Sequence, residues 1–200
     1  MGTKISEREL SFDNTVIHFL EAGPVNGKAV IMLHGMKFQA ETWRELGTMA
    51  ILAEAGFHVI ALDLPGFGKS PQSEMKHDAV LSCFIEKMGL DCPVLVGPSM
   101  GGRVSLEFGL DHPGQVGGLV LVGAVGVPEN QARLGEITVP CLAVWGSEDA
   151  ISSPANADIL TAAIDDARKV IIDGAAHPCY LDQPGNWHGA LLSFLKEFFC

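Results

Sequence analysis

The sequence predicts an α/β fold in which a mostly parallel sheet is covered by helices on both faces. Short, fully apolar runs, such as 29–33, 58–62 and 93–96, alternate with amphipathic segments of helical period. Strands that are apolar throughout are buried on both faces, which is typical of parallel sheets between helices. No repeat, linker or low-complexity stretch divides the 200 residues. We therefore expect a single domain over residues 1–200.

The expected elements follow one another with short connections. An antiparallel hairpin of Ile5–Phe12 and 15–20 opens the chain, joined by the turn residues Asp13-Asn14. Thr42 is expected to cap the first helix, because Glu45 follows it at the spacing of a capping box. Further strands are expected at 29–33, 58–62, 93–96, 119–122, 141–145 and 169–172, and helices at 42–55, 78–88, 100–112, 155–164 and 187–199.

A serine motif lies at one strand-to-helix junction. Gly97-Pro98-Ser99-Met100-Gly101 follows the apolar run 93–96 and reads G-x-S-x-G. A serine in this position sits on a tight turn, with its hydroxyl exposed at the carboxyl edge of the sheet. Glycines are needed beside it because the backbone is strained and a Cβ would collide with the neighbouring strand and helix. The strand before and the helix after make Ser99 a candidate nucleophile.

A serine nucleophile needs a base and an acid that orients the base. In a doubly wound sheet such groups gather beyond the carboxyl ends of the strands. The loop after 119–122 holds no acid, whereas Glu148 and Asp149 follow 141–145. We assign Asp149 as the acid and Glu148 as a solvated loop charge, with Glu148 as the alternative. His177 follows the strand 169–172 and comes third in the order Ser…Asp…His, which makes it the candidate base.

Two backbone amides are candidates for the oxyanion hole. The Met100 N–H follows the nucleophile and begins a helix, whose dipole favours negative charge. The Met36 N–H lies in the loop His34-Gly35-Met36, after the first parallel strand. We expect His34 to brace this loop by hydrogen bonding. The Gly- and Pro-containing loop 63–70 is expected to form a wall of the site, without chemistry of its own.

Three longer segments are more specific than the serine motif: HGMKF at 34–38 with ETW at 41–43, DLPGFGKS at 63–70, and HPCYLD at 177–182 with WH at 187–188. In them the chain resembles the α/β-hydrolases, and specifically the small proteins called abhydrolase domain-containing protein 14. The resemblance implies hydrolysis of short activated acyl esters and a protein partner. One member of this family removes acetyl groups from protein lysines and transfers them to coenzyme A, so the resemblance also implies this activity. The elbow SMGGR at 99–103 is the form common among general α/β-hydrolases, whereas the resembled proteins have a less regular turn.

The net charge, the lengths of the apolar runs and the cysteines indicate which partners and which location to expect. The net charge of −11, from 24 Asp and Glu against 13 Lys and Arg, argues against nucleic acid or an anionic membrane as a partner. The first ten residues lack an apolar core, and no apolar run approaches the ~18 residues of a membrane span. Met1, Gly2 and Ser6 match the myristoylation pattern, but this match is short and common by chance. Five cysteines without metal-binding spacing are typical of reduced thiols, so we expect a cytoplasmic protein.

The interval 124–138 bears on substrate size. This interval lies between the expected strands 119–122 and 141–145, where many α/β-hydrolases carry a helical cap. It is too short to fold into such a cap. An open site favours short acyl groups and argues against lipase action on long chains. Arg133, the one basic residue of the interval, could meet an anionic substrate group or be a solvated loop charge.

The sequence therefore predicts a serine hydrolase of short acyl esters or thioesters, or an acyl-transferring deacylase. We expect no metal or tightly bound cofactor, and coenzyme A only as an acyl acceptor. Two alternatives remain. One is a binding module that keeps the triad with little turnover. The other is a lyase, because a lyase and a hydrolase with this triad differ only in the shape of the pocket.

Overall fold

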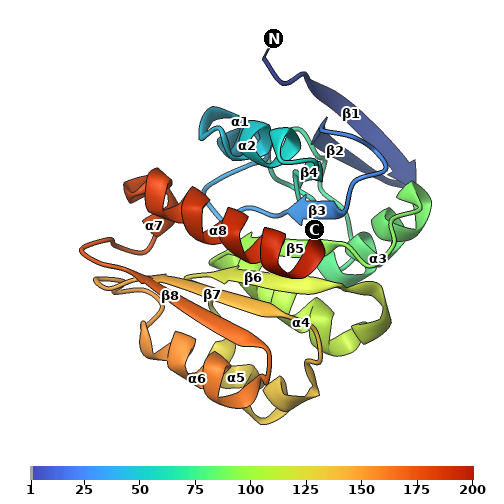
Figure 1. Ribbon diagram of the computed structural model, residues 1–200. Coiled ribbons are helices and arrows are strands. Elements are labelled where there is room, and N and C mark those ends of the chain that lie inside the picture. The colour runs from blue at the N-terminus through green and yellow to red at the C-terminus, as the bar shows by residue number, and fades with distance from the viewer. Residues whose placement is uncertain (1) are drawn as a thin grey trace.

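Eight strands form one sheet in the order β1-β2-β4-β3-β5-β6-β7-β8 in the computed structural model, which describes residues 2–200 (Figure 1). β1 pairs antiparallel with β2, and β2 pairs antiparallel with β4. All other neighbours are parallel. The predicted fold class, a mostly parallel sheet with an amino-terminal hairpin, is confirmed. Met1, and with it part of the myristoylation match, lies outside the described residues.

The strands and four of the five predicted helices agree with the structure to within three residues, and the short helices α5 and α7 were not predicted. The strands are β1 (Ile5–Phe12), β2 (Thr15–Ala22), β3 (Ala29–Met32), β4 (His58–Leu62), β5 (Val94–Pro98), β6 (Gly118–Val122), β7 (Cys141–Gly146) and β8 (Ala167–Ile172). The helices are α1 (Glu41–Glu45), α2 (Thr48–Glu54), α3 (His77–Met88), α4 (Met100–Asp111), α5 (Val127–Asn130), α6 (Ala155–Ala163), α7 (Cys179–Asp182) and α8 (Pro184–Phe199), with 3₁₀ turns η1 (Pro113–Gln115) and η2 (Gln131–Glu136).

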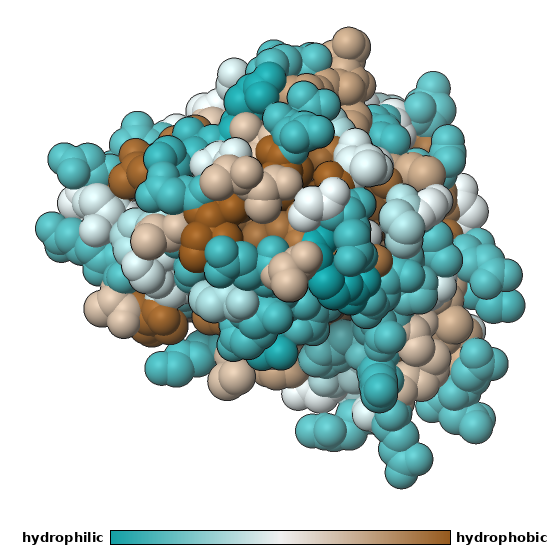
Figure 2. Space-filling view, turned by 90° about the horizontal axis from the view of Figure 1, so that it is seen from below, coloured by the Kyte–Doolittle hydropathy of each residue, from teal (hydrophilic) through white to brown (hydrophobic). Residues whose placement is uncertain are grey.

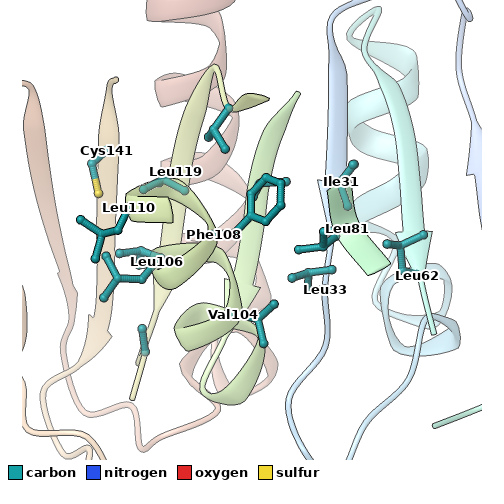
Figure 3. Packing of buried hydrophobic residues seen from close by; sticks show 14 of the residues in the cluster. Ile31, Leu33, Leu62, Leu81, Val104, Leu106, Phe108, Leu110, Leu119 and Cys141 are labelled. Carbon is teal, nitrogen blue, oxygen red and sulfur yellow. The ribbon is translucent and has the colours of Figure 1, made fainter. Parts of the chain in front are cut away.

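Helices cover both faces of the sheet, as predicted. α1, α2, α7 and α8 lie on one face, and α3, α4, α5 and α6 lie on the other (Figure 1). Alternate residues of a central strand enter opposite cores: Ile31 packs on the α4 side, whereas Val30 and Met32 pack on the α8 side. Figure 3 shows the α4 side, where Val104 and Phe108 point toward the sheet.

The outer surface is mixed. Seen from below, apolar side chains gather near the middle of the face and hydrophilic ones surround them (Figure 2). Over residues 2–200, no helix combines the length and the apolar character that a membrane crossing requires.

The predicted single helix over 42–55 is wrong: α1 and α2 are separate helices. Gly47 lies between the two helices, and its backbone is in the left-handed region with φ of 82°. Glycine adopts this conformation without a steric penalty. Thr42 lies inside α1 and does not cap it, because the residue before the helix is Ala40. The Ala40 N–H donates instead to Asp63 Oδ1 at 2.7 Å. A carboxylate from a distant loop therefore satisfies a donor at the start of α1.

The interval 124–138 forms no cap. It holds only the short α5 and η2, which pack against α4 and α6. Arg133 of η2 turns toward α4: its guanidinium pairs with Asp111 at 2.9 Å and Glu136 at 3.1 Å and donates to the Leu110 carbonyl at 3.2 Å. Arg133 is exposed, as expected of a solvated loop charge, and its ion pairs with Asp111 and Glu136 also tie η2 to α4.

Candidate active site

Ser99 turns the chain from strand to helix within one residue. β5 ends at Pro98 and α4 begins at Met100, while Ser99 itself has φ of 51° and ψ of −112°. A non-glycine residue with positive φ is strained and needs support from its surroundings. Two hydrogen bonds supply it: the Ser99 N–H donates to the Val122 carbonyl at 2.9 Å, and the Ser99 carbonyl accepts from the Arg103 N–H at 3.0 Å.

Three glycines allow the close packing that surrounds this turn. A Cβ on Gly97 would overlap the Gly101 carbonyl. A Cβ on Gly101 would lie 2.7 Å from the His34 carbonyl oxygen, and one on Gly102 would lie 2.6 Å from the Ala124 Cβ. Both distances are too short for real Cβ contacts. The elbow therefore packs directly against the loops that follow β3 and β6.

Asp149 and His177 form a hydrogen-bonded pair. Asp149 is buried, and its Oδ1 accepts the N–H groups of Ile151 at 2.9 Å and Ser152 at 2.8 Å. Its Oδ2 lies 2.8 Å from His177 Nδ1. Glu148, the alternative acid, is exposed. The structure thus brings Asp149, and not Glu148, to the imidazole.

The Asp149–His177 pair lies beside the elbow, and His177 Nε2 makes no contact with Asp149. Gly123, which follows β6, has φ of 49°, and a Cβ on it would lie 3.0 Å from Asp149 Oδ2 and 3.3 Å from His177 Nδ1. With Nδ1 donating to Asp149, Nε2 is free to accept a proton. No hydrogen bond joins the Ser99 hydroxyl to His177 in the described part of the chain, and such bonds are often long before substrate binds.

His34 braces the loop after β3, as expected. Its side chain is buried, and its Nε2 accepts the Leu64 N–H at 3.1 Å. The proton therefore sits on Nδ1, which donates to the Gly35 carbonyl at 2.9 Å. Burial lowers the pKa of His34, which favours this neutral form. The imidazole thus ties the loop after β3 to the loop after β4.

The two amides proposed for the oxyanion hole are available. Within residues 2–200, neither the Met36 N–H nor the Met100 N–H has a protein acceptor. Met100 is the first residue of α4, where a free N–H is expected. Met36 is 68% exposed, so its loop faces solvent at the edge of the sheet.

Asp63 is a site residue that sequence reasoning missed. It is buried and accepts three donors: the Ala40 N–H at 2.7 Å, the Lys69 N–H at 2.9 Å and His18 Nδ1 at 2.7 Å. A Cβ on Gly68, which has φ of 51°, would overlap this carboxylate. Asp63 thus holds the far end of the loop after β3 and organises the wall 63–70. The available signal is an Asp directly after a buried strand, at the start of a Gly-containing loop.

The fold and this arrangement match known proteins. The family described as alpha/beta hydrolase fold matches residues 28–134, and the chain belongs to this family. Within it the chain is an ABHD14-like α/β hydrolase. It is 35% identical over 210 residues to "Putative protein-lysine deacylase ABHD14B" of Homo sapiens, covering 98% of this chain and 99% of the relative. It is 35% identical over 196 residues to Protein ABHD14A of Danio rerio, covering 90% and 72%.

Solved structures share the fold at lower identity. A protein described as a predicted CIB-like hydrolase from Thermoplasma acidophilum superposes with a TM-score of 0.93 and 24% identity, covering 98% of this chain and 100% of that chain. The carboxylesterase CesB from Bacillus subtilis superposes with a TM-score of 0.85 and 18% identity, covering 96% and 92%. These likenesses concern the fold alone.

Replacing Asp63 by Asn should lower the free energy of unfolding by about 3 kcal/mol, because the amide cannot accept all three donors and leaves buried groups unpaired. Urea unfolding followed by circular dichroism measures this loss. Asp91→Asn is the matched control on the exposed surface and should change stability by less than about 0.5 kcal/mol. Equal stability of the Asp63 variant and the wild type would contradict the bracing role.

His34 should make stability sensitive to acid. Its folded pKa is lowered from 6.5 by burial, so the unfolded chain binds this proton more readily. Stability is full above pH 6.5 and is lost as the pH falls toward the lowered pKa, by at most about 1.4 kcal/mol per pH unit. When the free energy of unfolding is measured by urea at several pH values, His34→Gln should remove the part of its pH dependence that comes from His34. His77 and His188, whose pKa values burial also lowers, are common to both proteins and cancel.

A second measurement covers the case in which His34→Gln does not fold. In the wild type, the imidazole carbons of His34 observed by NMR should remain in the neutral form below pH 6.5. Protonation of the folded protein at the ordinary pH would contradict the assignment.

Proposed function

We propose that this protein is a serine hydrolase that cleaves short-chain acyl esters or thioesters, with Ser99 as nucleophile, His177 as base and Asp149 as the acid that orients it. One observation carries the proposal. A strained serine at a strand-to-helix elbow lies beside two unpaired amides and near a hydrogen-bonded Asp–His pair. Membership of the α/β hydrolase family supports it.

The proposed reaction follows from the placement of these groups. Ser99 Oγ attacks the acyl carbon while His177 Nε2 takes the hydroxyl proton. The carbonyl oxygen becomes an oxyanion held by the Met36 and Met100 amides, and Asp149 stabilises the imidazolium through Nδ1. The bond to the leaving group then breaks, and the leaving group takes the proton from His177. Water, or another nucleophile, repeats these steps on the acyl-serine and releases the acid or a transferred acyl group.

The substrate is proposed to have a short acyl group on a leaving part of any size. Without a cap, little apolar surface encloses a long chain, whereas a bulky leaving part can remain in solvent. The name of the ABHD14B relatives supports a deacylase that acts on acylated lysine side chains of a partner protein. We propose coenzyme A only as an acyl acceptor, and neither a metal nor a bound cofactor takes part in the steps above. The five free cysteines support a cytoplasmic location.

Hydrolysis of a chromogenic acetyl ester, with its burst of released alcohol, tests the proposal. Ser99→Ala and His177→Ala should each lower kcat/KM by about 10³-fold or more, because either loss removes activation of the nucleophile. Asp149→Asn should cost somewhat less. Glu148→Gln, an exposed acid one residue away, is the matched control and should stay within about twofold.

Two outcomes would contradict the proposal in different ways. Full activity of Asp149→Asn together with an inactive Glu148→Gln would make Glu148 the acid. A wild-type protein that shows no burst and whose Ser99 reacts with no fluorophosphonate would be a binding module and not a hydrolase.

A further inference from the structure

We infer that the Phe38 ring forms a fixed wall on the acyl side of Ser99 that limits the length of the acyl chain, and that Tyr180 holds this ring in place. The inference rests on the proposed function, since it assigns a substrate feature to the same site. It concerns residues in two loops: the one after β3 and the one that begins with His177.

Phe38 lies next to the nucleophile. The position that a Cβ of Gly35 would occupy is 3.4 Å from Phe38 Cδ2 and 3.8 Å from Ser99 Cβ, so the ring and the serine flank one small space. The Phe38 N–H donates to the Gly35 carbonyl at 3.0 Å, which closes the turn between these two residues. Phe38 is half-buried and therefore presents part of its ring at the surface of the site.

The sheet order places Phe38 on the acyl side. Ser99 follows β5, whose neighbours are β3 on one side and β6 on the other. Phe38 follows β3, whereas His177 and Asp149 pack against Gly123, which follows β6. The imidazole donates its proton to the leaving group, so the leaving group points toward the β6 side. The oxyanion and the acyl chain then share the β3 side, where the Met36 amide and Phe38 lie.

Tyr180 prevents the ring from swinging away. It is the single tyrosine of the chain and is 2% exposed. Its ring meets Phe38 edge-on at a centroid distance of 6.3 Å and packs against Trp43 at 5.2 Å. Trp43 is anchored in turn, because its Nε1 donates to the Leu33 carbonyl at 3.0 Å. The wall is therefore backed by buried aromatic rings.

The same contacts connect the wall to the base. Tyr180 belongs to α7, which begins two residues after His177. The Ala176 N–H donates to Asp182 Oδ2 at 2.9 Å, so the segment that carries His177 closes on itself. Phe38 and the His177 loop are thus held in one arrangement, and a longer acyl chain cannot be accommodated by moving either alone.

Ester series and covalent labelling test the wall. The ratio of kcat/KM for p-nitrophenyl octanoate to that for the acetate is measured for wild type and Phe38→Ala, together with labelling rates of Ser99 by octyl and ethyl fluorophosphonates. Phe38→Ala should raise both long-to-short ratios by about tenfold or more, because removing the ring opens space for several methylenes. An unchanged ratio would overturn the inference.

Variants of Tyr180 test the support. Tyr180→Leu should raise the same ratios by about threefold, whereas Tyr180→Phe keeps the ring and should retain the wild-type ratios. Phe84→Leu is the matched control: it breaks the edge-on pair of Phe84 with Phe19, at 5.2 Å, on the opposite face of the sheet. It should lower thermal stability without moving the ratios. Equal shifts in the Phe84 and Tyr180 variants would reduce the effect to general loosening and overturn the role of Tyr180.

A series of leaving groups tests whether Phe38 lies on the acyl side or on the leaving-group side. Acetyl esters of phenol and of larger naphthols should respond equally in wild type and Phe38→Ala. A selective gain for large alcohols would place Phe38 on the leaving-group side and overturn the inference, while leaving the proposed hydrolase intact. Absence of labelling by every phosphonate in the wild type would instead refute the proposed function.

Discussion

The strained backbone of Ser99 is the constraint on which the site depends. A residue at φ of 51° between a strand and a helix persists only if neighbouring elements hold it from several sides. Here β6 accepts its N–H, and the glycines at 101 and 102 let the loops after β3 and β6 approach the elbow to within contact distance. The packing that supports the strain is the same packing that brings the loop after β3 and the Asp149–His177 pair close to the serine.

Two buried carboxylates in this protein have nearly the same donor sets. Asp149 accepts two loop N–H groups and the Nδ1 of His177; Asp63 accepts two loop N–H groups and the Nδ1 of His18. The difference lies at the other nitrogen. His18 is buried and its Nε2 faces Glu7 at 3.1 Å, whereas the His177 side chain is 16% exposed. Of the two imidazoles, that of His177 is therefore the more open to solvent, as its proposed role as base requires.

The parts that could be predicted from sequence are those with local signals. Apolar runs located every strand, and the loop position after a strand was enough to bring Asp149 and His177 together. The parts that could not be predicted depend on contacts between distant segments. The start of α1 is satisfied by Asp63, 23 residues away, so the local Thr42–Glu45 pattern did not decide the helix boundary. The Tyr180 contact with Phe38 joins residues from opposite ends of the chain, and no spacing rule predicts it.

The absence of a cap changes which residues can determine specificity. In this chain α5 and η2 pack down on the body, and Arg133 is engaged by Asp111 and Glu136 rather than directed at substrate. For the acyl substrate proposed above, the residues that face the acyl chain would then come from the loops at the edge of the sheet. In the proposed mechanism, the loop after β3 supplies both the Met36 amide and a boundary for the acyl chain, which requires more rigidity than a solvent-facing loop ordinarily has. His34, Asp63 and Tyr180 supply that rigidity from three directions, by two sets of hydrogen bonds and one of aromatic contacts.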